Sequence, residues 1–178
     1  MAVQDILQLG NPYLRERSVS ITNVDAPEVQ RAITDLGDTL ADFQQRNGFG
    51  RAISAVQIGI PYRLIYMRID KPVVLVNPVI ADFSDEKMIL WDDCFSFPNL
   101  MVKVQRHLRI DVRYTNEQGI QTELRAEGSL SELLQHEIDH LDGMLAVDRA
   151  IDKDSFCLRQ EWEKRYKTNL PLIKTNQA

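Results

Sequence analysis

The chain has 178 residues, of which 44% are hydrophobic and 26% charged, a composition that excludes a disordered or fibrous protein. A net charge of −5 argues against a chain that wraps nucleic acid. No run approaches the roughly 18 apolar residues of a membrane span, and Met1–Asp5 does not resemble the start of a signal peptide. We therefore expect a cytoplasmic protein with no membrane contact, folded as a single domain over residues 1–178.

The first part of the chain predicts a turn and a helix. Gly10–Pro12 is a turn signal that separates residues 6–9 from the next segment of the chain. From Pro27 to about Arg46, apolar residues recur at steps of three and four, which predicts a helix. Asn47-Gly48 is expected to end it.

The middle of the chain predicts β-strands. Short segments rich in β-branched and aromatic residues are separated by Pro, Gly, Asn and Asp, as in strands joined by tight turns. Residues 115–119 are expected to connect the last two strands as a hairpin. The predicted strands are Tyr62–Ile69, Val73–Val76, Met101–Val104, Leu108–Tyr114 and Ile120–Leu124.

Two further helices are predicted near the C-terminus. The first begins with a capping box, in which Ser129 and Glu132 satisfy backbone N–H groups, and ends at a left-handed Gly143. The second covers roughly Asp154–Lys167, with an apolar stripe formed by Leu158, Trp162 and Tyr166.

Two of the three histidines lie in the first of these helices, in an HExxH pattern. At 100° per residue, His136 and His140 are one turn apart on one face, so their imidazoles can bind one metal ion. Glu137 flanks that ion without binding it, as a general base must. Imidazole suits Zn, Fe, Ni or Co, so the motif does not name the metal.

A catalytic site usually has a third protein ligand, and the residues leave its identity open. Glu161 and Glu163 lie at roughly the downstream spacing found in some metalloproteases. Cys94 lies in a turn-like, polar segment bracketed by aromatic residues, which suits a loop that presents a thiolate. The order of elements predicts an α+β fold, with antiparallel β-sheets packed around a central metal-binding helix and with an N-terminal and a C-terminal helix.

Three segments of the chain together resemble the signatures of the peptide deformylase family. Gln135–Gly143 (QHEIDHLDG) matches QHExDHLxG at every fixed position. Asp92–Ser96 (DDCFS) resembles EGCxS, and Gly50–Gln57 (GRAISAVQ) resembles GxGxAAxQ. Order and spacing also agree, and Leu9–Arg15 resembles the family's N-terminal stretch, so the resemblance covers nearly the whole chain.

The resemblance implies an enzyme that removes the formyl group from N-formylmethionyl peptides of new proteins and releases formate. It implies one divalent metal ion, Fe²⁺ or alternatively Zn²⁺, Ni²⁺ or Co²⁺, held by Cys94, His136 and His140. Glu137 would be the general base, and the Gln57 side chain and the Phe95 backbone N–H would stabilise the oxyanion. The partner would be the formylated nascent chain, with a ribosome contact through the C-terminal helix. The expected substrate contacts are Gly50, Ala52, Asp93 and Leu133.

The chain also departs from these signatures. Asp92-Asp93 replaces Glu-Gly: Asp92 is expected to pair with Arg106, whereas Asp93 puts a carboxylate near the metal, where glycine would tolerate a positive φ. Ala52 replaces a glycine and is expected to narrow the groove, and Ser54 replaces an alanine. Further on, Ser129 and Glu132 stand where apolar side chains can form the methionine pocket, which would make that pocket more polar.

Two alternative functions remain open at this point. One is a divergent deformylase-like amidase that acts on another N-acylated substrate. The other is a catalytically weak protein that keeps the metal for structure or for peptide capture. An intact Glu137 argues against the second, since a purely structural metal site needs no base.

Overall fold

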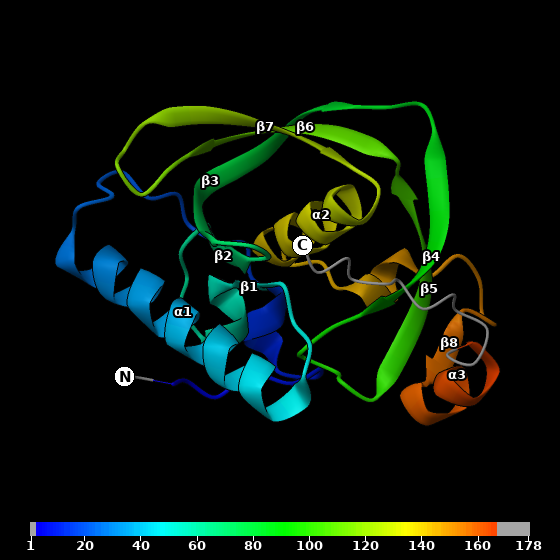
Figure 1. The fold of residues 1–178 in the computed structure, drawn as a ribbon. Helices are drawn as coiled ribbons and strands as arrows, with labels where there is room; N and C mark the ends of the chain where they lie inside the picture. Colours follow the sequence, from blue (N-terminus) through cyan, green and yellow to red (C-terminus); the bar gives the residue numbers. More distant parts are fainter. Residues whose placement is uncertain (1–2, 167–178) are drawn as a thin grey trace, which may run out of the picture.

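The computed structural model describes residues 3–166, which form helices and antiparallel sheets, as the α+β prediction requires (Figure 1). None of the helices in this range is long and apolar enough to cross a membrane. In chain order the elements are η1 (Pro12–Arg15), α1 (Pro27–Asn47), β1 (Ala52–Ser54), η2 (Ala55–Ile58), β2 (Leu64–Arg68), β3 (Pro72–Phe83), β4 (Lys87–Asp93), β5 (Leu100–His107), β6 (Arg109–Thr115), β7 (Gln121–Glu127), α2 (Ser129–Leu141), η3 (Ala146–Arg149), β8 (Phe156–Leu158) and α3 (Arg159–Tyr166).

The strands form two antiparallel sheets around α2. One has the order β1-β2-β3-β6-β7 and the other β4-β5-β8. Figure 1 shows α2, in yellow, enclosed by the strands, with α1 on the opposite side of β1 and β2. Leu134, Ile138 and Leu141 of α2 pack on the larger sheet, against residues such as Ile65 and Val112. Every α2 residue from Ser131 onward is buried, so its polar side chains lie inside the protein.

Helix α1 confirms the prediction from periodicity. Its buried face includes Leu36 and Leu40, which join a hydrophobic cluster with Ile53 of β1 and Leu64 of β2. The helix ends at Asn47, and Gly48 adopts the left-handed conformation (φ 75°) while its N–H donates to the Gln44 carbonyl. Helix α1 thereby leads directly into the segment that enters β1.

The strand predictions are correct in position and too short in three places. β3 runs from Pro72 to Phe83, well beyond Val76, because the Asn77-Pro78 pair that resembles a turn is an irregularity within the strand. Asn77 has φ 51°, and its side chain bonds both the N–H and the carbonyl of Ile21. β5 likewise extends from Leu100 to His107 and β7 from Gln121 to Glu127, and β6 and β7 pair as the predicted hairpin.

Strand β4, over Lys87–Asp93, was not predicted. It pairs along its whole length with β5 and lies at the edge of the smaller sheet. Edge strands that alternate exposed and half-buried residues carry a weak hydrophobic pattern, which explains the omission. The strand matters for the site because its end carries Asp92, Asp93 and then Cys94.

The expected capping box at the start of α2 was wrong. Gly128 occupies the N-cap position, no side chain caps the helix, and Ser129 is already helical. Glu132 points instead toward Arg51 (2.7 Å), because the buried carboxylate finds an ionic partner there. At the other end Gly143 has φ 74°, as predicted, and a Cβ there would lie 2.4 Å from the Arg15 carbonyl oxygen.

The last helix begins later than predicted. Residues 156–158 form β8, which pairs with β5, and α3 begins at Arg159. The predicted stripe is therefore divided: Leu158 is an exposed strand residue, whereas Trp162 and Tyr166 lie on the helix with ring centroids 6.0 Å apart. Pairing with β5 overrides the helical pattern here. Lys167, the predicted last residue, lies outside the described residues.

Candidate active site

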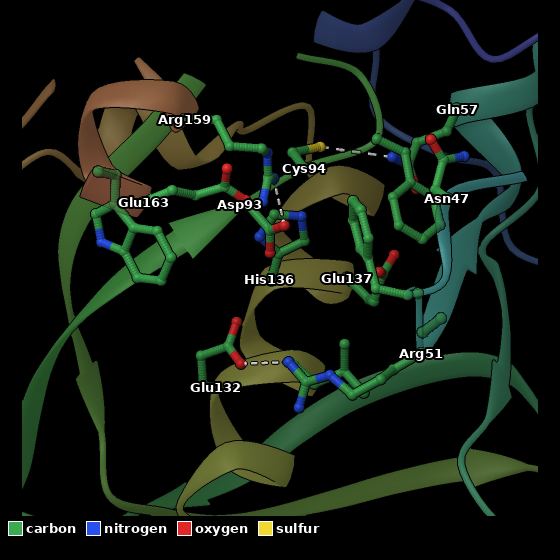
Figure 2. Close-up of a pocket in the computed structure, with 16 residues that line it drawn as sticks. Asn47, Arg51, Gln57, Asp93, Cys94, Glu132, His136, Glu137, Arg159 and Glu163 are labelled. Atoms are coloured by element: carbon green, nitrogen blue, oxygen red, sulfur yellow. Dashed lines mark hydrogen bonds and ion pairs between the residues drawn. The ribbon is translucent and has the colours of Figure 1, made fainter. Parts of the chain in front are cut away.

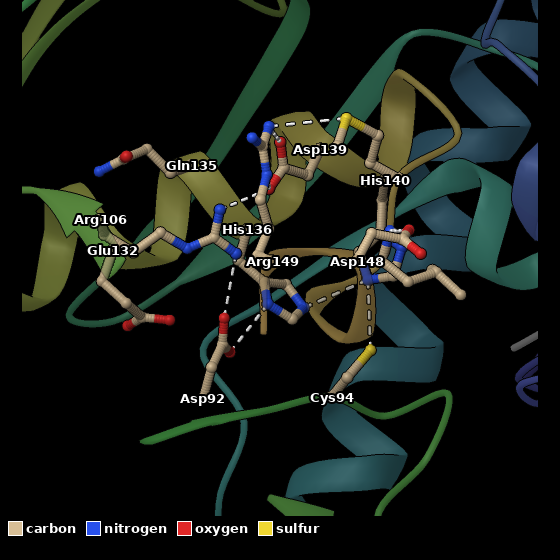
Figure 3. Close-up of polar contacts among 12 residues, drawn as sticks. Asp92, Cys94, Arg106, Glu132, Gln135, His136, Asp139, His140, Asp148 and Arg149 are labelled. Atoms are coloured by element: carbon tan, nitrogen blue, oxygen red, sulfur yellow. Dashed lines mark hydrogen bonds and ion pairs between the residues drawn. The ribbon is translucent and has the colours of Figure 1, made fainter. Parts of the chain in front are cut away.

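The two histidines of α2 and Cys94, just after β4, converge at one point. His140 Nε2 lies 3.2 Å from Cys94 Sγ and 3.2 Å from His136 Nε2 (Figure 3). All three residues are buried, and the cysteine forms no disulfide. Their ligand atoms all lie within 4.8 Å of one another.

This geometry fits a single bound metal ion. Bond lengths of about 2.0–2.1 Å to nitrogen and 2.3 Å to sulfur place tetrahedral ligand atoms roughly 3.3–3.6 Å apart, close to the separations observed. His140 Nδ1 is buried without a hydrogen-bond partner among residues 3–166, so its other nitrogen, Nε2, is the one directed at its neighbours. Three protein ligands leave a position for water or substrate. The donor set therefore suits a catalytic ion.

The downstream glutamates do not complete this group. Glu161 lies on the exposed side of α3, where Lys164 binds it at 2.6 Å. Glu163 lines the pocket but is not among the ligand atoms that cluster with the histidines in the described residues. A second cluster of Asp92, Glu132 and His136 exists, but arginines hold both of its carboxylates. Cys94 is the third ligand that the geometry favours.

A buried charge network orients His136. Asp92 Oδ1 lies 2.9 Å from His136 Nδ1, and Arg106 donates to Asp92 at 3.0 Å and to Asp139. Burial alone would raise the pKa of Asp92, but His136 and Arg106 outweigh it and hold the pKa below its ordinary value. A carboxylate behind a ligating histidine fixes the tautomer and the ring orientation. The expected pairing of Asp92 with Arg106 is confirmed, and Asp139 adds a second partner.

Glu137 faces the same space from α2. It is 3% exposed, and Ser54 Oγ donates to its carboxylate and also, at 3.0 Å, to its backbone carbonyl. Burial raises the pKa of Glu137 above its ordinary value, although His136 and the Ser54 hydroxyl oppose the rise. A carboxyl group with a raised pKa beside a metal-ligand cluster has the properties of a general base.

Two hydrogen-bond donors lie near Cys94. Gln57 accepts from the Ser54 N–H at 2.9 Å, which turns its Nε2 toward Cys94 Sγ (3.6 Å; Figure 2) and Ser96 Oγ (3.3 Å). The Phe95 ring stacks on Phe43, and within the described part of the chain its backbone N–H donates to no other residue. Both donors are thus held in place by groups outside the site.

A pocket of about 610 Å³ opens over these residues, and all four predicted substrate contacts line it. Leu133 and Ala52 contribute apolar surface. Gly50 has φ 126°, and a Cβ there would lie 2.9 Å from the Phe95 ring, so a larger residue would disturb the loop. Asp93 lies at the end of β4 and Arg159 binds it at 2.6 Å, so the carboxylate expected near the metal is an ion-pair partner of α3.

Several pocket residues were not singled out from the sequence. Phe49 and Arg51, in the segment before β1, and Arg159, at the start of α3, line the pocket. No local pattern distinguishes an arginine that faces a pocket from one on a solvated surface. The partners that bring these residues together are more than 60 positions away in the sequence, so only the fold could identify them.

The site has the features of a mononuclear metal-dependent hydrolase: a cysteine sulfur and two imidazoles that converge, a buried glutamate and an open pocket. Comparisons with known proteins give the family. Residues 3–156 match the polypeptide deformylase family, and the chain belongs to it. The peptide deformylase of Bartonella quintana is 34% identical over 173 residues, covering 94% of this chain and 95% of that protein. That of Natranaerobius thermophilus is 37% identical over 152 residues, covering 84% and 94%.

Solved structures agree with this assignment. A peptide deformylase from Synechococcus elongatus in complex with actinonin superposes with a TM-score of 0.80 at 29% identity, covering 92% of this chain and 86% of that one. The Thermotoga maritima peptide deformylase gives 0.79 at 31% identity, covering 85% and 100%. The protein is therefore a metallohydrolase of the family that cleaves N-formyl amide bonds.

Proposed function

We propose that this protein removes the formyl group from N-formylmethionyl peptides of newly made proteins and releases formate. The observation that carries the proposal is the position of Glu137, a buried carboxylate of raised pKa that lines the pocket together with Cys94 and His136, whose ligand atoms cluster with that of His140. Family membership supports the reaction class.

Cys94, His136 and His140 would hold one divalent ion, and we propose Fe²⁺, with Zn²⁺, Ni²⁺ or Co²⁺ as alternatives. A soft thiolate with two imidazoles suits these metals better than Mg²⁺ or Ca²⁺. When bound, such an ion polarises the formyl carbonyl and lowers the pKa of water toward neutrality.

Residues of the chain supply the proton transfers and the charge stabilisation. Glu137 takes a proton from the attacking water and passes it to the departing amine, and its raised pKa makes the carboxylate a better proton acceptor. Negative charge develops on the formyl oxygen, where the Gln57 amide and the Phe95 N–H would donate to it. The contacts of Gln57 to sulfur and hydroxyl are long, so a substrate oxygen can replace them.

The proposed partner is the formylated nascent chain in the cytoplasm. Gly50 and Asp93 both line the pocket, whose volume of about 610 Å³ leaves room for a peptide backbone. A ribosome contact through the C-terminal helix is also proposed, and the basic Lys164 and Arg165 in the last described turn of α3 support it. Co-sedimentation of the protein with ribosomes tests this contact.

The amidase alternative has one observation in its favour, the Arg51–Glu132 ion pair in the pocket. An apolar acyl-methionine is not the natural complement of buried charge. The alternative is separated from the leading proposal by comparing formyl-Met-Ala-Ser with other formyl and acetyl peptides.

Formate release from formyl-Met-Ala-Ser by anaerobically purified, metal-analysed protein tests the proposed function. Glu137→Gln is nearly isosteric, so it should keep the metal and the fold while turnover falls by about 10²–10⁴-fold. Metal-loaded wild-type protein that releases no formate would contradict the proposal. Near wild-type turnover by a metal-loaded Glu137→Gln variant would remove that residue from the mechanism.

A further inference from the structure

A second cavity lies on the other side of α2 from the active site. Its volume of about 740 Å³ is within the range of ligand-binding pockets, and it shares no lining residue with the first pocket. Ile138 lines it, and at 100° per residue Ile138 lies about 160° around the helix from His136. His136 and Glu137 line only the first pocket, so a ligand in the second cavity would not cover them.

The second cavity carries one cation in excess, although the chain as a whole has a net charge of −5. Lys87 lines it with an exposed side chain, whose ammonium forms no hydrogen bond or ion pair with any residue in the range 3–166. The other charges compensate one another in three pairs: Arg63 with Asp142, Arg149 with Asp139, and Arg106 with Asp92. Because arginines already bind both carboxylates that line the cavity, it favours an anion over a cation.

A buried donor without an acceptor indicates the same preference. Arg106 lines the second cavity and is only 3% exposed. Figure 3 shows its terminal nitrogens directed at Asp92 and Asp139, but its Nε–H has no acceptor in the described part of the chain. Leaving a buried N–H unpaired costs free energy, so a ligand that brings an acceptor oxygen into the cavity is favoured.

Part of the second cavity is apolar and open to solvent. Val79, Phe83 and Ile151 line it although each is between 43% and 48% exposed. Single exposed apolar residues are common, but three around one cavity form a surface that the apolar part of a ligand can cover. His107 joins this surface to the cation, because it is the cross-strand partner of Lys87 and its ring centroid lies 4.7 Å from that of Phe83.

We infer that the second cavity is a binding site for a small carboxylate with an apolar chain, in which Lys87 is the charge partner and Phe83 packs against the chain. A carboxylate without a chain would gain only the exposed contact with Lys87, which is weak. A neutral ligand would leave the excess cation uncompensated. The site is separate from the catalytic groups, so the inference goes beyond the proposed deformylase activity and does not depend on it.

Titration of hexanoate into the zinc-loaded protein, followed by backbone amide chemical shifts, tests the site. A ligand of this size in an open site should give a Kd on the order of 1 mM. The largest shifts should fall on residues 79–83 and 87, and not on residues 94–96, where a carboxylate bound to the metal would act. Hexanamide has the same chain without the charge and should bind about two- to fivefold more weakly, the contribution expected of an exposed ion pair. Acetate has the charge without the chain and should not saturate the site at the same concentrations.

Variants of exposed residues separate the two contributions without disturbing the core. Lys87→Met should weaken hexanoate binding about two- to fivefold and abolish its advantage over hexanamide. Lys71→Met, at an exposed lysine that does not line the cavity, should change neither. Phe83→Ala should weaken both ligands, whereas Phe156→Ala, at a similarly exposed phenylalanine of β8, should leave both unchanged.

Three results would overturn the inference. The first is a set of hexanoate shifts confined to residues 94–96, which would place the carboxylate at the metal. The second is equal affinity for hexanoate and hexanamide, or an unchanged hexanoate Kd in Lys87→Met. The third is the absence of saturable shifts well above the expected Kd. None of these results bears on formate release, so the proposed function is tested separately.

Discussion

At the scale of single residues, Ser54 influences the pKa of Glu137, the proposed general base. It stands where the resembling family signature has alanine, it is completely buried, and its hydroxyl donates to the Glu137 carboxylate. A hydrogen bond to the charged form of an acid lowers its pKa. Ser54 is a positioning residue, since it acts through Glu137, and its N–H also holds Gln57.

Ser54→Ala should move the pH dependence of the reaction. Without the hydroxyl, the pKa of Glu137, already raised by burial, should rise further, because the charged carboxylate loses a donor. The acidic limb of the kcat/KM profile for formate release should then shift to higher pH. A variant whose rate falls equally at all pH values would show that Ser54 has only a structural role.

At the scale of elements, Arg159 connects α3 to residues from other parts of the chain that line the pocket. Arg159 donates to Asp93 and to the Pro98 carbonyl on one side, and its guanidinium lies 5.0 Å from the centre of the Phe49 ring on the other. Asp93 ends a regular strand, and Asn77 is the only non-glycine residue with positive φ in the range 3–166. Asp93 therefore does not use the positive φ that a glycine would tolerate at this position.

Arg159→Ala should favour longer substrates. A partly exposed ion pair contributes up to about 1 kcal/mol. Loss of the Arg159–Asp93 ion pair should therefore raise kcat/KM for formylated pentapeptides relative to formyl dipeptides by up to about fivefold. Asp93→Gly should act in the same direction, and the double variant should add little to either. Fully additive effects on the substrate-length ratio would show that the two residues act separately.

The end of α2 supplies a second prediction at this scale. Gly143 combines φ 74° with a close approach to the Arg15 carbonyl, so Gly143→Ala should lower the free energy of unfolding by about 2 kcal/mol or more. Gly119→Ala is the matched control, because its φ is 76° and nothing lies within 4 Å of the added Cβ. Urea unfolding measures both. Equal losses in the free energy of unfolding of the two variants would mean that the positive φ accounts for the whole effect and the contact with Arg15 for none of it.

At the scale of the whole molecule, the site joins parts that are far apart in the chain. Cys94 directly follows β4 of the smaller sheet, the two histidines lie in α2, and Gln57 lies in η2 beside the larger sheet. A metal ion held by Cys94 and α2 therefore links the two sheet systems. Because the unfolded chain lacks the preformed site, metal binding stabilises the fold.

Removing the metal should lower thermal stability. An ion at about a thousand times its Kd contributes roughly 4 kcal/mol, which corresponds to about 8–16 °C in Tm for a chain of this size. Scanning calorimetry before and after chelation measures the shift. Cys94→Ser should bind the softer metals more weakly and show a smaller shift, whereas Cys157→Ser, in β8, should show the full one. A full shift in Cys94→Ser would mean that another residue is the third ligand.

Much of the fold could be predicted because its signals are local. The stripe of α1, the hairpin of β6 and β7, and the left-handed Gly48 and Gly143 depend on residues a few positions apart. The errors fall where distant pairing overrides local preference. β8 replaces the first turn of a predicted helix because these residues pair with β5. Glu132 forms an ion pair with Arg51 instead of capping α2.

The sequence alone predicted a metal site, because HExxH is a local motif whose geometry follows from helical periodicity, and the resemblance of three segments to the family signatures implied the reaction class and the roles of Cys94 and Gln57. The tertiary structure alone decided which polar side chains meet: Arg51 with Glu132, Arg159 with Asp93, and Ser54 with Glu137. Each of these pairs joins residues more than 60 positions apart, and a polar residue in a sequence gives no indication of its partner. The packing of α2 and α3 around the pocket therefore decides which polar groups face it.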